Sequence, residues 1–273
     1  MRSHLLKIAG VSLAALIAAS ACAKNEEVPA TPAPAAEIAA PVVVAPDYPA
    51  LLLAADRPVA DAGRDADRKP AEVLAFSKIM PGQTVFEIEA GGGYYTELLS
   101  HAVGPAGKVT MQAPKEFEAF YKKDVDARLA ANRLPNVTLS QTLFDKLDAP
   151  DASVDVVTWF QGPHELYFKP DNIPAGTGDP VKSYAEVFRI LKPGGYFIIM
   201  DHAAKAGEPA TTGNTLHRID PMLVKAAATT AGFVSDGEST LLANPADDHS
   251  KGVFDPTIQG KTDQFLFRYQ KPS

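Results

Sequence analysis

A run of three glycines lies where a buried strand passes into a helix, and this junction constrains the fold more than any other feature of the chain. Residues 84–88 form a short apolar run that predicts a buried strand, and residues 94–103 have the pattern of a helix. Gly91, Gly92 and Gly93 lie between them. Glycines there let the backbone approach a ligand at the positive end of a helix. The junction therefore predicts a ligand-binding loop, although it lacks the Lys-Ser/Thr pair of a nucleoside-triphosphate loop.

Strands and helices alternate through the rest of the chain. The pattern predicts further strands at residues 108–112, 137–140, 154–160, 196–200, 233–241 and 264–269. It predicts helices at residues 70–79, 116–131, 181–191 and 221–231. This order predicts an α/β, doubly wound, mostly parallel sheet with helices on both faces. Ligands of such sheets bind beyond the carboxyl ends of the strands.

The first 22 residues have the order of a secretory signal. Arg2 and Lys7 precede an apolar run at 8–18, which is too short to span a bilayer as a mature helix, and Ala-Ser-Ala-Cys follows. Signal peptidase would cleave after the small residues, whereas a lipoprotein-type signal would make Cys22 a lipidated N-terminus. Ala19 stands where the lipoprotein signal usually has Leu, but Cys22 is the only cysteine in the chain. We predict an exported, periplasmic protein, with a lipid anchor at Cys22 favoured over ordinary cleavage.

A linker and one folded domain are predicted after the signal. Residues 23–47 are rich in alanine and proline without an apolar period, which predicts an extended linker. Residues 48–273 contain all of the predicted strands and helices and form the domain. The net charge is −7 and basic residues form no block, so the sequence argues against nucleic acid and favours a small-molecule partner.

Four segments together carry a family resemblance. They are the glycine loop with its flanking strand and helix (85–97), Pro-Asp-Ala-Ser-Val-Asp (150–155), Leu-Lys-Pro-Gly-Gly (191–195) and Ala-Gly-Phe (231–233). In order and spacing they resemble class I S-adenosylmethionine-dependent methyltransferases. The resemblance covers roughly residues 54–272, and implies a seven-stranded sheet with an antiparallel last strand and S-adenosylmethionine as the cofactor. Residues 201–202, 215–220, 244–248 and 253–256 further resemble a group of exported predicted methyltransferases.

The resemblance implies roles for several residues near the first and fourth strands. Glu87 matches the acid that ends the first strand and is linked to the methionine part of the cofactor. Gly91 and Gly93 match the close-approach glycines of the loop. Gln161, at the end of the fourth strand, falls where the chain meets the methionine part or the acceptor.

Three positions depart from the family pattern. Glu89 replaces the first glycine of the loop, and it either pairs with the cofactor's positive charge or obstructs binding. Gln112 stands where an acid usually accepts from both ribose hydroxyls, so ribose binding is expected to be weaker or arranged differently. Asp145 is the nearest candidate for the acid beside adenine, although Leu143 fits the spacing better.

Two acid–histidine pairs follow the central strands. His164-Glu165 follows the fourth predicted strand and Asp201-His202 ends the fifth, so all four side chains are expected at one edge of the sheet. We predict His164 as a general base and Asp201 as the group that orients His202 or the acceptor. The alternative is that these side chains bond to neighbouring loops and have no catalytic role.

The same donors, with His217, are of types that bind zinc, iron or manganese, but they share no short metal-binding signature, and we assign no metal. We predict that His217 and Arg218 contact the substrate, with Arg218 holding a carboxylate or phosphate; the alternative is a salt-bridged turn with Asp220. The long loop at 243–260 suggests a lid or a partner surface.

The sequence thus predicts an exported methyltransferase that acts on an unidentified small molecule. The alternative is a binding protein that keeps the fold and holds another small ligand, which Glu89 and Gln112 favour. A metal-dependent hydrolase is a weaker third reading.

Overall fold

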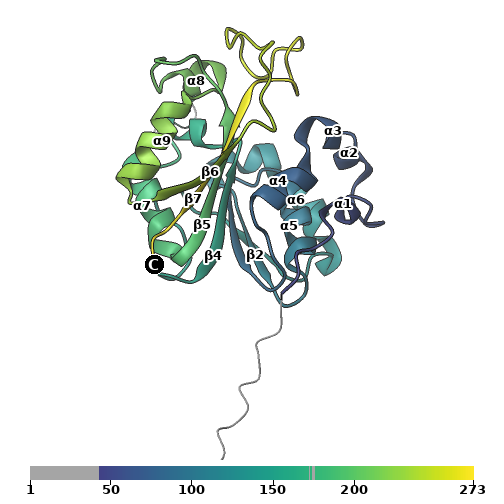
Figure 1. The fold of residues 1–273 in the computed structure, drawn as a ribbon. Helices are drawn as coiled ribbons and strands as arrows, with labels where there is room; N and C mark the ends of the chain where they lie inside the picture. Colours follow the sequence, from purple (N-terminus) through teal and green to yellow (C-terminus); the bar gives the residue numbers. More distant parts are fainter. Residues whose placement is uncertain (1–42, 172, 174–175) are drawn as a thin grey trace, which may run out of the picture. The chain divides into compact units, whose positions relative to one another are not determined.

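The computed structural model describes residues 43–171, 173 and 176–273 (Figure 1). The signal peptide, Cys22 and residues 23–42 of the predicted linker lie outside the described residues. The predictions made for those segments therefore stay predictions.

One seven-stranded sheet forms the centre of the domain, in the order β3-β2-β1-β4-β5-β7-β6. Its strands are β1 (Thr84–Ile88), β2 (Lys108–Gln112), β3 (Val137–Ser140), β4 (Val154–Phe160), β5 (Leu191–His202), β6 (Val234–Ser239) and β7 (Gln264–Gln270). The first five strands pair in parallel, whereas β7 is antiparallel to both β5 and β6. The predicted fold class and the antiparallel last strand are confirmed.

Helices cover both faces of the sheet (Figure 1). The α-helices are α1 (Tyr48–Leu51), α2 (Val59–Ala62), α3 (Asp65–Arg68), α4 (Pro70–Phe76), α5 (Tyr94–Val103), α6 (Glu118–Leu129), α7 (Pro180–Ile190), α8 (Thr212–Leu216) and α9 (Pro221–Thr230). Short 3₁₀ helices are η1 (Lys115–Phe117), η2 (Ala130–Asn132) and η3 (Pro163–Tyr167). One buried cluster packs α7 and α9 against the sheet, and a second packs α1, α4 and α5 against the opposite face.

The helices α7 and α9 begin with the same local chemistry. The Asp179 carboxylate accepts from the backbone N–H of Lys182, and the Asp220 carboxylate accepts from that of Met222. A proline follows each aspartate at the first helical position, where its missing N–H has no cost. These pairs explain why both helices start within a residue of the predicted positions.

The helix and strand boundaries differ from prediction mainly next to turns. The predicted helix at 70–79 ends at Phe76, and the one at 116–131 divides into η1, α6 and η2. Ala131 has a φ of +52°, which breaks the helical path. The fifth strand starts earlier than predicted because Leu191 already pairs with Val154 before the Gly194-Gly195 bend.

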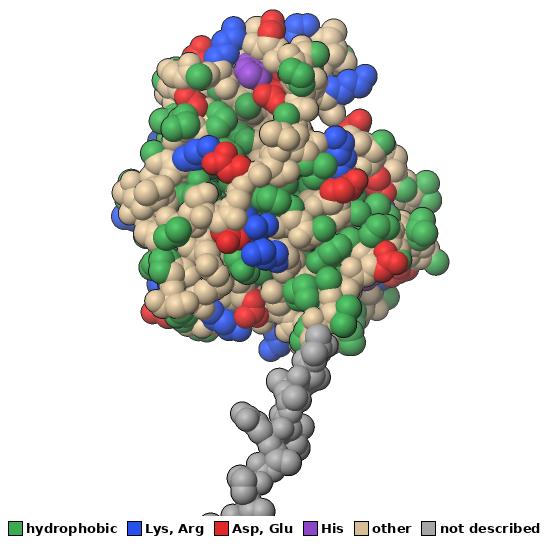
Figure 2. Space-filling view, in the orientation of Figure 1, with side chains coloured by type: hydrophobic (Ala, Val, Ile, Leu, Met, Phe, Trp, Pro, Cys, Tyr) green, Lys and Arg blue, Asp and Glu red, His purple; other side chains and the backbone are tan. Residues whose placement is uncertain are grey.

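Within the described residues, no helix is long and apolar enough to cross a membrane. The face in Figure 2 shows acidic and basic side chains interspersed. The carboxyl ends of β1, β4 and β5 lie side by side in the parallel part of the sheet. This places Glu89, Gln161 and His202, which follow or end these strands, at one edge.

Candidate functional site

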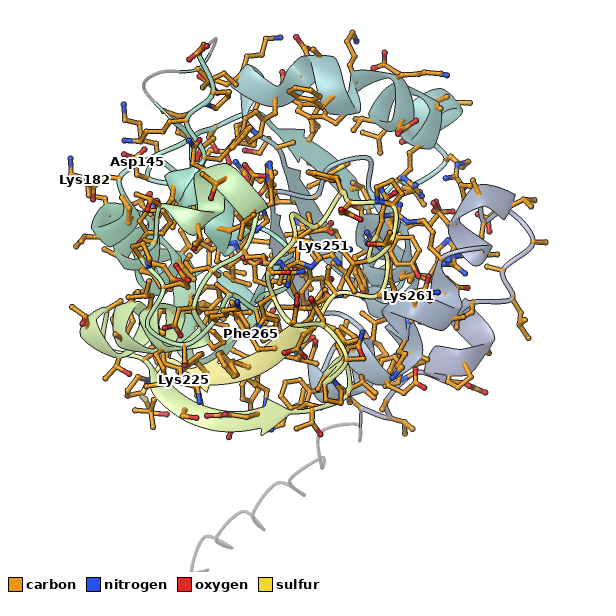
Figure 3. All side chains as sticks on the ribbon, turned by 90° about the horizontal axis from the view of Figure 1, so that it is seen from above. Asp145, Lys182, Lys225, Lys251, Lys261 and Phe265 are labelled. Atoms are coloured by element: carbon orange, nitrogen blue, oxygen red, sulfur yellow. The ribbon has the colours of Figure 1, made fainter. Side chains whose placement is uncertain are left out.

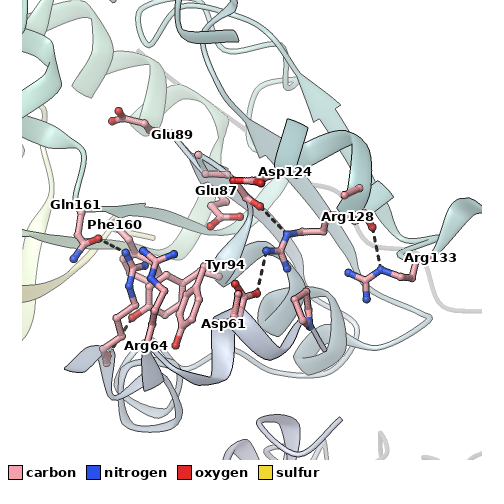
Figure 4. A pocket seen from close by; sticks show the side chains of 18 of the residues that line it. Asp61, Arg64, Glu87, Glu89, Tyr94, Asp124, Arg128, Arg133, Phe160 and Gln161 are labelled. Atoms are coloured by element: carbon pink, nitrogen blue, oxygen red, sulfur yellow. Dashed lines mark hydrogen bonds and ion pairs between the residues drawn. The ribbon is translucent and has the colours of Figure 1, made fainter. Parts of the chain in front are cut away.

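A cavity of about 610 Å³ opens along the glycine loop, which we define as residues 89–93 (Figure 4). The ends of β1 and β4 form one side, and the segment 56–68 and α6 form the others. We call it the loop cavity. Its lining includes Asp56, Asp61, Arg64, Arg68, Glu87, Glu89, Gly91, Gly92, Tyr94, Tyr95, Asp124, Arg128, Arg133, Phe160 and Gln161. Its volume falls in the range typical of small-molecule and cofactor sites.

The glycines of the loop meet two different structural needs. Gly91 has a φ of +54°, and a Cβ added there would meet no atom within 4 Å, so the backbone is open to the cavity. Gly93 has a φ of +83° and precedes α5; a Cβ there would lie 2.6 Å from Cδ of Arg128. Gly91 thus leaves room for a ligand, whereas Gly93 leaves room for an arginine.

Arg128 fixes the loop through a buried network. Its Nε donates to the carbonyl oxygen of Gly92 at 2.7 Å, and its guanidinium pairs with Glu97 and with Asp61. Arg133 pairs with Glu97 from the other side at 2.7 Å. The side chain of Glu97 is fully buried, so two arginines and the carboxylates of Glu97 and Asp61 join α5, α6 and the segment 56–68 around the loop.

Glu87 lies at the inner end of the cavity. The side chain is 2% exposed, and its carboxylate accepts from the hydroxyl of Thr96. Burial raises the pKa of Glu87 to about 8, against smaller lowering effects from the Thr96 hydrogen bond and the charge of Arg128. Near neutral pH, Glu87 is therefore largely protonated, and a cationic group placed beside it would favour its ionised form.

This raised pKa predicts a pH-dependent loss of stability. The unfolded chain releases the Glu87 proton near its ordinary pKa, whereas the folded chain holds it up to about pH 8, so stability falls as pH rises through this window. From pH 6 to pH 8, the free energy of unfolding of the wild-type protein is expected to fall by about 2 kcal/mol more than that of the Glu87→Gln variant. Urea unfolding of both proteins at the two pH values measures the difference. Equal losses in the two proteins would contradict the buried, protonated Glu87.

Glu89 adopts the backbone conformation that glycine usually supplies. Its φ is +53°, and its backbone N–H donates to Oε1 of Gln112 at 2.8 Å. Figure 4 shows the carboxyl group pointing away from Asp61 and Arg64. A Cβ added at Gly162 would lie 2.4 Å from Oε2 of Glu89, and that oxygen is buried without a hydrogen-bond partner. The carboxyl group thus turns toward the residues after β4, and the loop cavity stays open.

The other two departures from the family pattern lie outside the lining of the loop cavity. Besides accepting from Glu89, the Gln112 amide donates to the carbonyl oxygen of Thr142 at 2.6 Å, and its side chain is fully buried. Asp145 lies at the outer edge of the molecule in Figure 3, where its carboxylate accepts from the backbone N–H of Asp179 at 3.1 Å. Both side chains therefore form hydrogen bonds with backbone groups of the protein.

A second cavity of about 390 Å³ adjoins the first. It is lined by Arg64, Asp67, Arg68, Gln161, His202, Val253, Phe254, Gln259, Gly260 and Gln264. Arg64, Arg68 and Gln161 line both cavities. Gln161 accepts from Nη2 of Arg68 at 2.9 Å and donates to Gln264 at 3.1 Å. In the described part of the chain, no carboxylate lies within 4.0 Å of either arginine's nitrogens, so both guanidiniums are available to an anionic ligand.

The structure brings all four side chains of the two acid–histidine pairs together but gives them unequal surroundings. Asp201 is fully buried and accepts from the backbone N–H groups of His164 and His202. Oδ1 of Asp201 lies 2.7 Å from Nδ1 of His164, and Nε2 of His164 lies 3.2 Å from Oε1 of Glu165. Despite the opposing effect of burial, Asp201 and Glu165 raise the pKa of His164 to about 10, and His164 lowers the pKa of Glu165 to about 2.

These surroundings do not suit the predicted role of His164 as a general base. His164 is 3% exposed and lines none of the described cavities, and it is a cation near neutral pH. His202 lines the second cavity, and its Nδ1 lies 2.7 Å from the hydroxyl of Thr262. Burial and the charge of His164 hold the pKa of His202 well below its usual range. Of the two histidines, His202 and not His164 therefore faces a cavity.

Arg218 does not have the predicted environment of a substrate-binding residue. It is fully buried; its guanidinium pairs with Asp247 at 2.8 Å and donates to the carbonyl oxygens of Ala203 and Lys251. The partner is thus Asp247 and not the Asp220 of the alternative reading. Figure 3 shows the loop with Lys251 crossing the edge of the sheet. Arg218 fixes this loop, from which Val253 and Phe254 line the second cavity.

The sequence did not predict that segment 56–68 and α6 line the loop cavity. Arg64 and Arg68 lie one helical turn apart, and this spacing was the available signal. The helices α2 and α3 have four residues each, and a helix this short shows no apolar period in the sequence. Asp124 on α6 was also missed; its carboxylate lies 3.0 Å from the position of a Cβ on Gly92.

Residues 86–199 match the family model described as a methyltransferase domain. This part of the chain is therefore similar to a methyltransferase domain. A curated relative, the ubiquinone/menaquinone biosynthesis C-methyltransferase UbiE of Ectopseudomonas mendocina, is 29% identical over 136 residues, which are 50% of this chain and 48% of UbiE. The chain therefore spans about half the length of the curated relatives it matches.

Solved structures share the fold of this domain. A SAM-dependent methyltransferase from Aquifex aeolicus has a TM-score of 0.55 at 21% identity, covering 82% of this chain and 98% of the other. The [4+2]-cyclase SpnF has a TM-score of 0.54 at 16% identity, covering 76% and 82%. Both solved structures are less than 25% identical to this chain, so they indicate the shared fold alone.

Proposed function

We propose that this protein transfers a methyl group from S-adenosylmethionine to a small anionic molecule. The observation that carries the proposal is the junction of two cavities, one along the glycine loop and one lined by His202, with Arg64, Arg68 and Gln161 shared between them. A donor and an acceptor in adjoining cavities is the arrangement that direct methyl transfer needs. The fold alone does not fix the acceptor.

The residues around the loop cavity fit S-adenosylmethionine at its methionine end. The open backbone at Gly91 gives close approach, and the buried Glu87 carboxyl suits a cationic amino group. Gln112 is occupied by backbone groups, so we assign the ribose hydroxyls to Asp124, whose carboxylate lies beside Gly92 in the cavity lining. When bound, the cofactor supplies an electrophilic methyl group on a sulfonium.

The second cavity supplies charge and a base for the acceptor. Arg64 and Arg68 are proposed to bind a carboxylate or phosphate of the acceptor. The negative charge of that group would be attracted to the two guanidinium groups. In the tautomer in which Nδ1 of His202 donates to Thr262, Nε2 is left to take the proton from an acceptor hydroxyl or amine.

The sequence supports a further proposal about location. We infer from the signal at residues 1–22 that the protein is exported to the periplasm, with Cys22 as its lipid anchor. Mass spectrometry of the mature N-terminus tests this, since an unmodified N-terminus at or beyond residue 22 would contradict the anchor.

A glycine pair tests the cofactor site. Gly91→Leu places a side chain in the loop cavity and is expected to weaken S-adenosylmethionine binding at least about 100-fold in calorimetric titration. Gly82→Leu is the matched control, because Gly82 also has a positive φ, of +82°, and open space at Cβ, but lies outside the cavity lining. Equal affinities in the two variants would contradict the proposed site.

The second candidate function is a non-catalytic protein that holds another small ligand. Glu89 and the occupied Gln112 favour it, because both depart from the family pattern at the loop. The similarity to the [4+2]-cyclase SpnF is consistent with other uses of the fold. Absence of S-adenosylmethionine binding at millimolar concentration in the wild-type protein would favour this candidate.

A further inference from the structure

We propose that His164, Glu165 and His217 form a binding site for a divalent transition-metal ion, with Zn²⁺ as the probe. The site lies beside the second cavity, because the ring centroid of His217 is 5.0 Å from that of Phe254, and it belongs to neither lining. It is independent of methyl transfer, because it is built from the 3₁₀ helix η3 and the end of α8 and not from the glycine loop.

The donor atoms have the spacing of ligands around one ion. One nitrogen of each histidine and one carboxylate oxygen of Glu165 lie within 4.8 Å of one another. Oε1 of Glu165 is 3.2 Å from Nε2 of His164 and 3.3 Å from Nδ1 of His217. Ligand atoms bound about 2.1 Å from one ion lie about 3.0 Å apart at a right angle and about 3.4 Å apart at the tetrahedral angle. Both distances fall in this interval.

Asp201 orients His164 as the outer partner of a metal-bound histidine does. Its Oδ1 lies 2.7 Å from Nδ1 of His164, and two backbone N–H groups fix its own carboxylate. Binding of the ion would displace the Nε2 proton of the His164 cation, while the proton on Nδ1 stays donated to Asp201. The Nε2 lone pair is then directed at the proposed ion. Carboxylate–histidine–metal arrangements of this kind set the tautomer and the direction of the ring.

His217 is held in position by aromatic rings. The Phe168 ring centroid lies 4.7 Å and that of Phe254 5.0 Å from the His217 ring centroid. His217 ends α8 with a φ of +53°, which turns its side chain toward Glu165. An apolar shell around an imidazole limits water access and strengthens binding of an ion by the enclosed donors.

The second oxygen of Glu165 provides the further sign of a missing partner. Oε2 of Glu165 is buried and has no hydrogen-bond partner among the described residues. A buried carboxylate oxygen without a partner is costly, and a cation beside Glu165 would satisfy it. Imidazole nitrogens with carboxylate oxygens are the donor set of zinc, iron and manganese sites. The sequence reasoning, which assigned no metal, had no short signature to use because His217 lies 52 residues beyond Glu165.

Metal analysis of tag-free protein tests the site. After treatment with a chelator, loading with Zn²⁺ and dialysis, the wild-type protein is expected to retain one zinc per chain by mass spectrometry, with a rise in Tm on loading. His217→Asn is expected to retain at least 10-fold less zinc, since asparagine tolerates the positive φ but lacks the ring nitrogen.

His249→Asn is the matched control. His249 also has a positive φ, of +61°, but its ring contacts Asp263 and lies outside the cluster, so this variant is expected to retain zinc as the wild-type protein does. Glu165→Gln serves as a second variant in case His217→Asn does not fold. No retained zinc in the wild-type protein, or equal zinc in the wild-type protein and in a folded His217→Asn or Glu165→Gln, would overturn the proposal.

Discussion

Arg218→Met is expected to lower the free energy of unfolding by about 3–5 kcal/mol, because it leaves the buried Asp247 carboxylate without its cation. The substitution also removes the donors to the carbonyl oxygens of Ala203 and Lys251. Methionine has a similar length and apolar stem, so the loss comes from the charge and the hydrogen bonds. Urea unfolding measures the change.

The same variant tests whether Arg218 supports the loop at 243–260 or binds substrate. Loss of its bonds to Asp247 and Lys251 frees the loop, so limited proteolysis is expected to cut it faster than in the wild-type protein. Arg64→Met is the control, since Arg64 is exposed and is expected to change neither the unfolding midpoint nor the cleavage rate. An Arg218→Met protein with wild-type stability would contradict the structural role.

Glu97→Gln is expected to cost about 3 kcal/mol of stability and to weaken cofactor binding as well. Glu97 is the fully buried carboxylate between Arg128 and Arg133, and its loss leaves two cationic groups with too little negative charge. Arg128 is also the residue that holds the carbonyl oxygen of Gly92, so a displaced Arg128 changes the glycine loop. Unfolding and calorimetric titration of the same preparation measure the two effects.

Glu118→Gln is the matched control for Glu97→Gln. Glu118 pairs with Lys115 at 2.7 Å on the surface of the domain, where water and salt screen the pair. We expect no resolvable change in stability or binding. A Glu97→Gln protein that behaves like Glu118→Gln would show that the buried network does not hold the loop.

The sheet could be predicted from the sequence because its central strands are continuous apolar runs between glycine or proline turns. The predicted bounds of β1 and β4 agree with the structure to the residue. A parallel strand buried on both faces has this uniform pattern, and turn residues mark its ends. The edge of the sheet that gathers the candidate site residues follows directly from such strands.

Much of the site's detail depends on contacts between residues far apart in the sequence, which no local pattern contains. Arg218 pairs with Asp247, which lies 29 residues later in a loop, and His164 pairs with Asp201. Both predicted functional residues are therefore buried, ion-paired groups. The wall at residues 56–68 consists of short helices that tertiary packing stabilises. Glu89 keeps the backbone conformation of a glycine, so its departure from the family pattern changes the side chain and not the path of the loop.

A crystal structure of the protein grown with S-adenosylhomocysteine is the most direct measurement of the proposed cofactor site. We predict that the ligand lies against Gly91 and Gly92 with its amino group beside Glu87 and its ribose beside Asp124. Its sulfur is predicted to face Gln161, toward the second cavity. Binding at another place, or an empty loop cavity at millimolar ligand, would contradict the proposed methyl-transfer function.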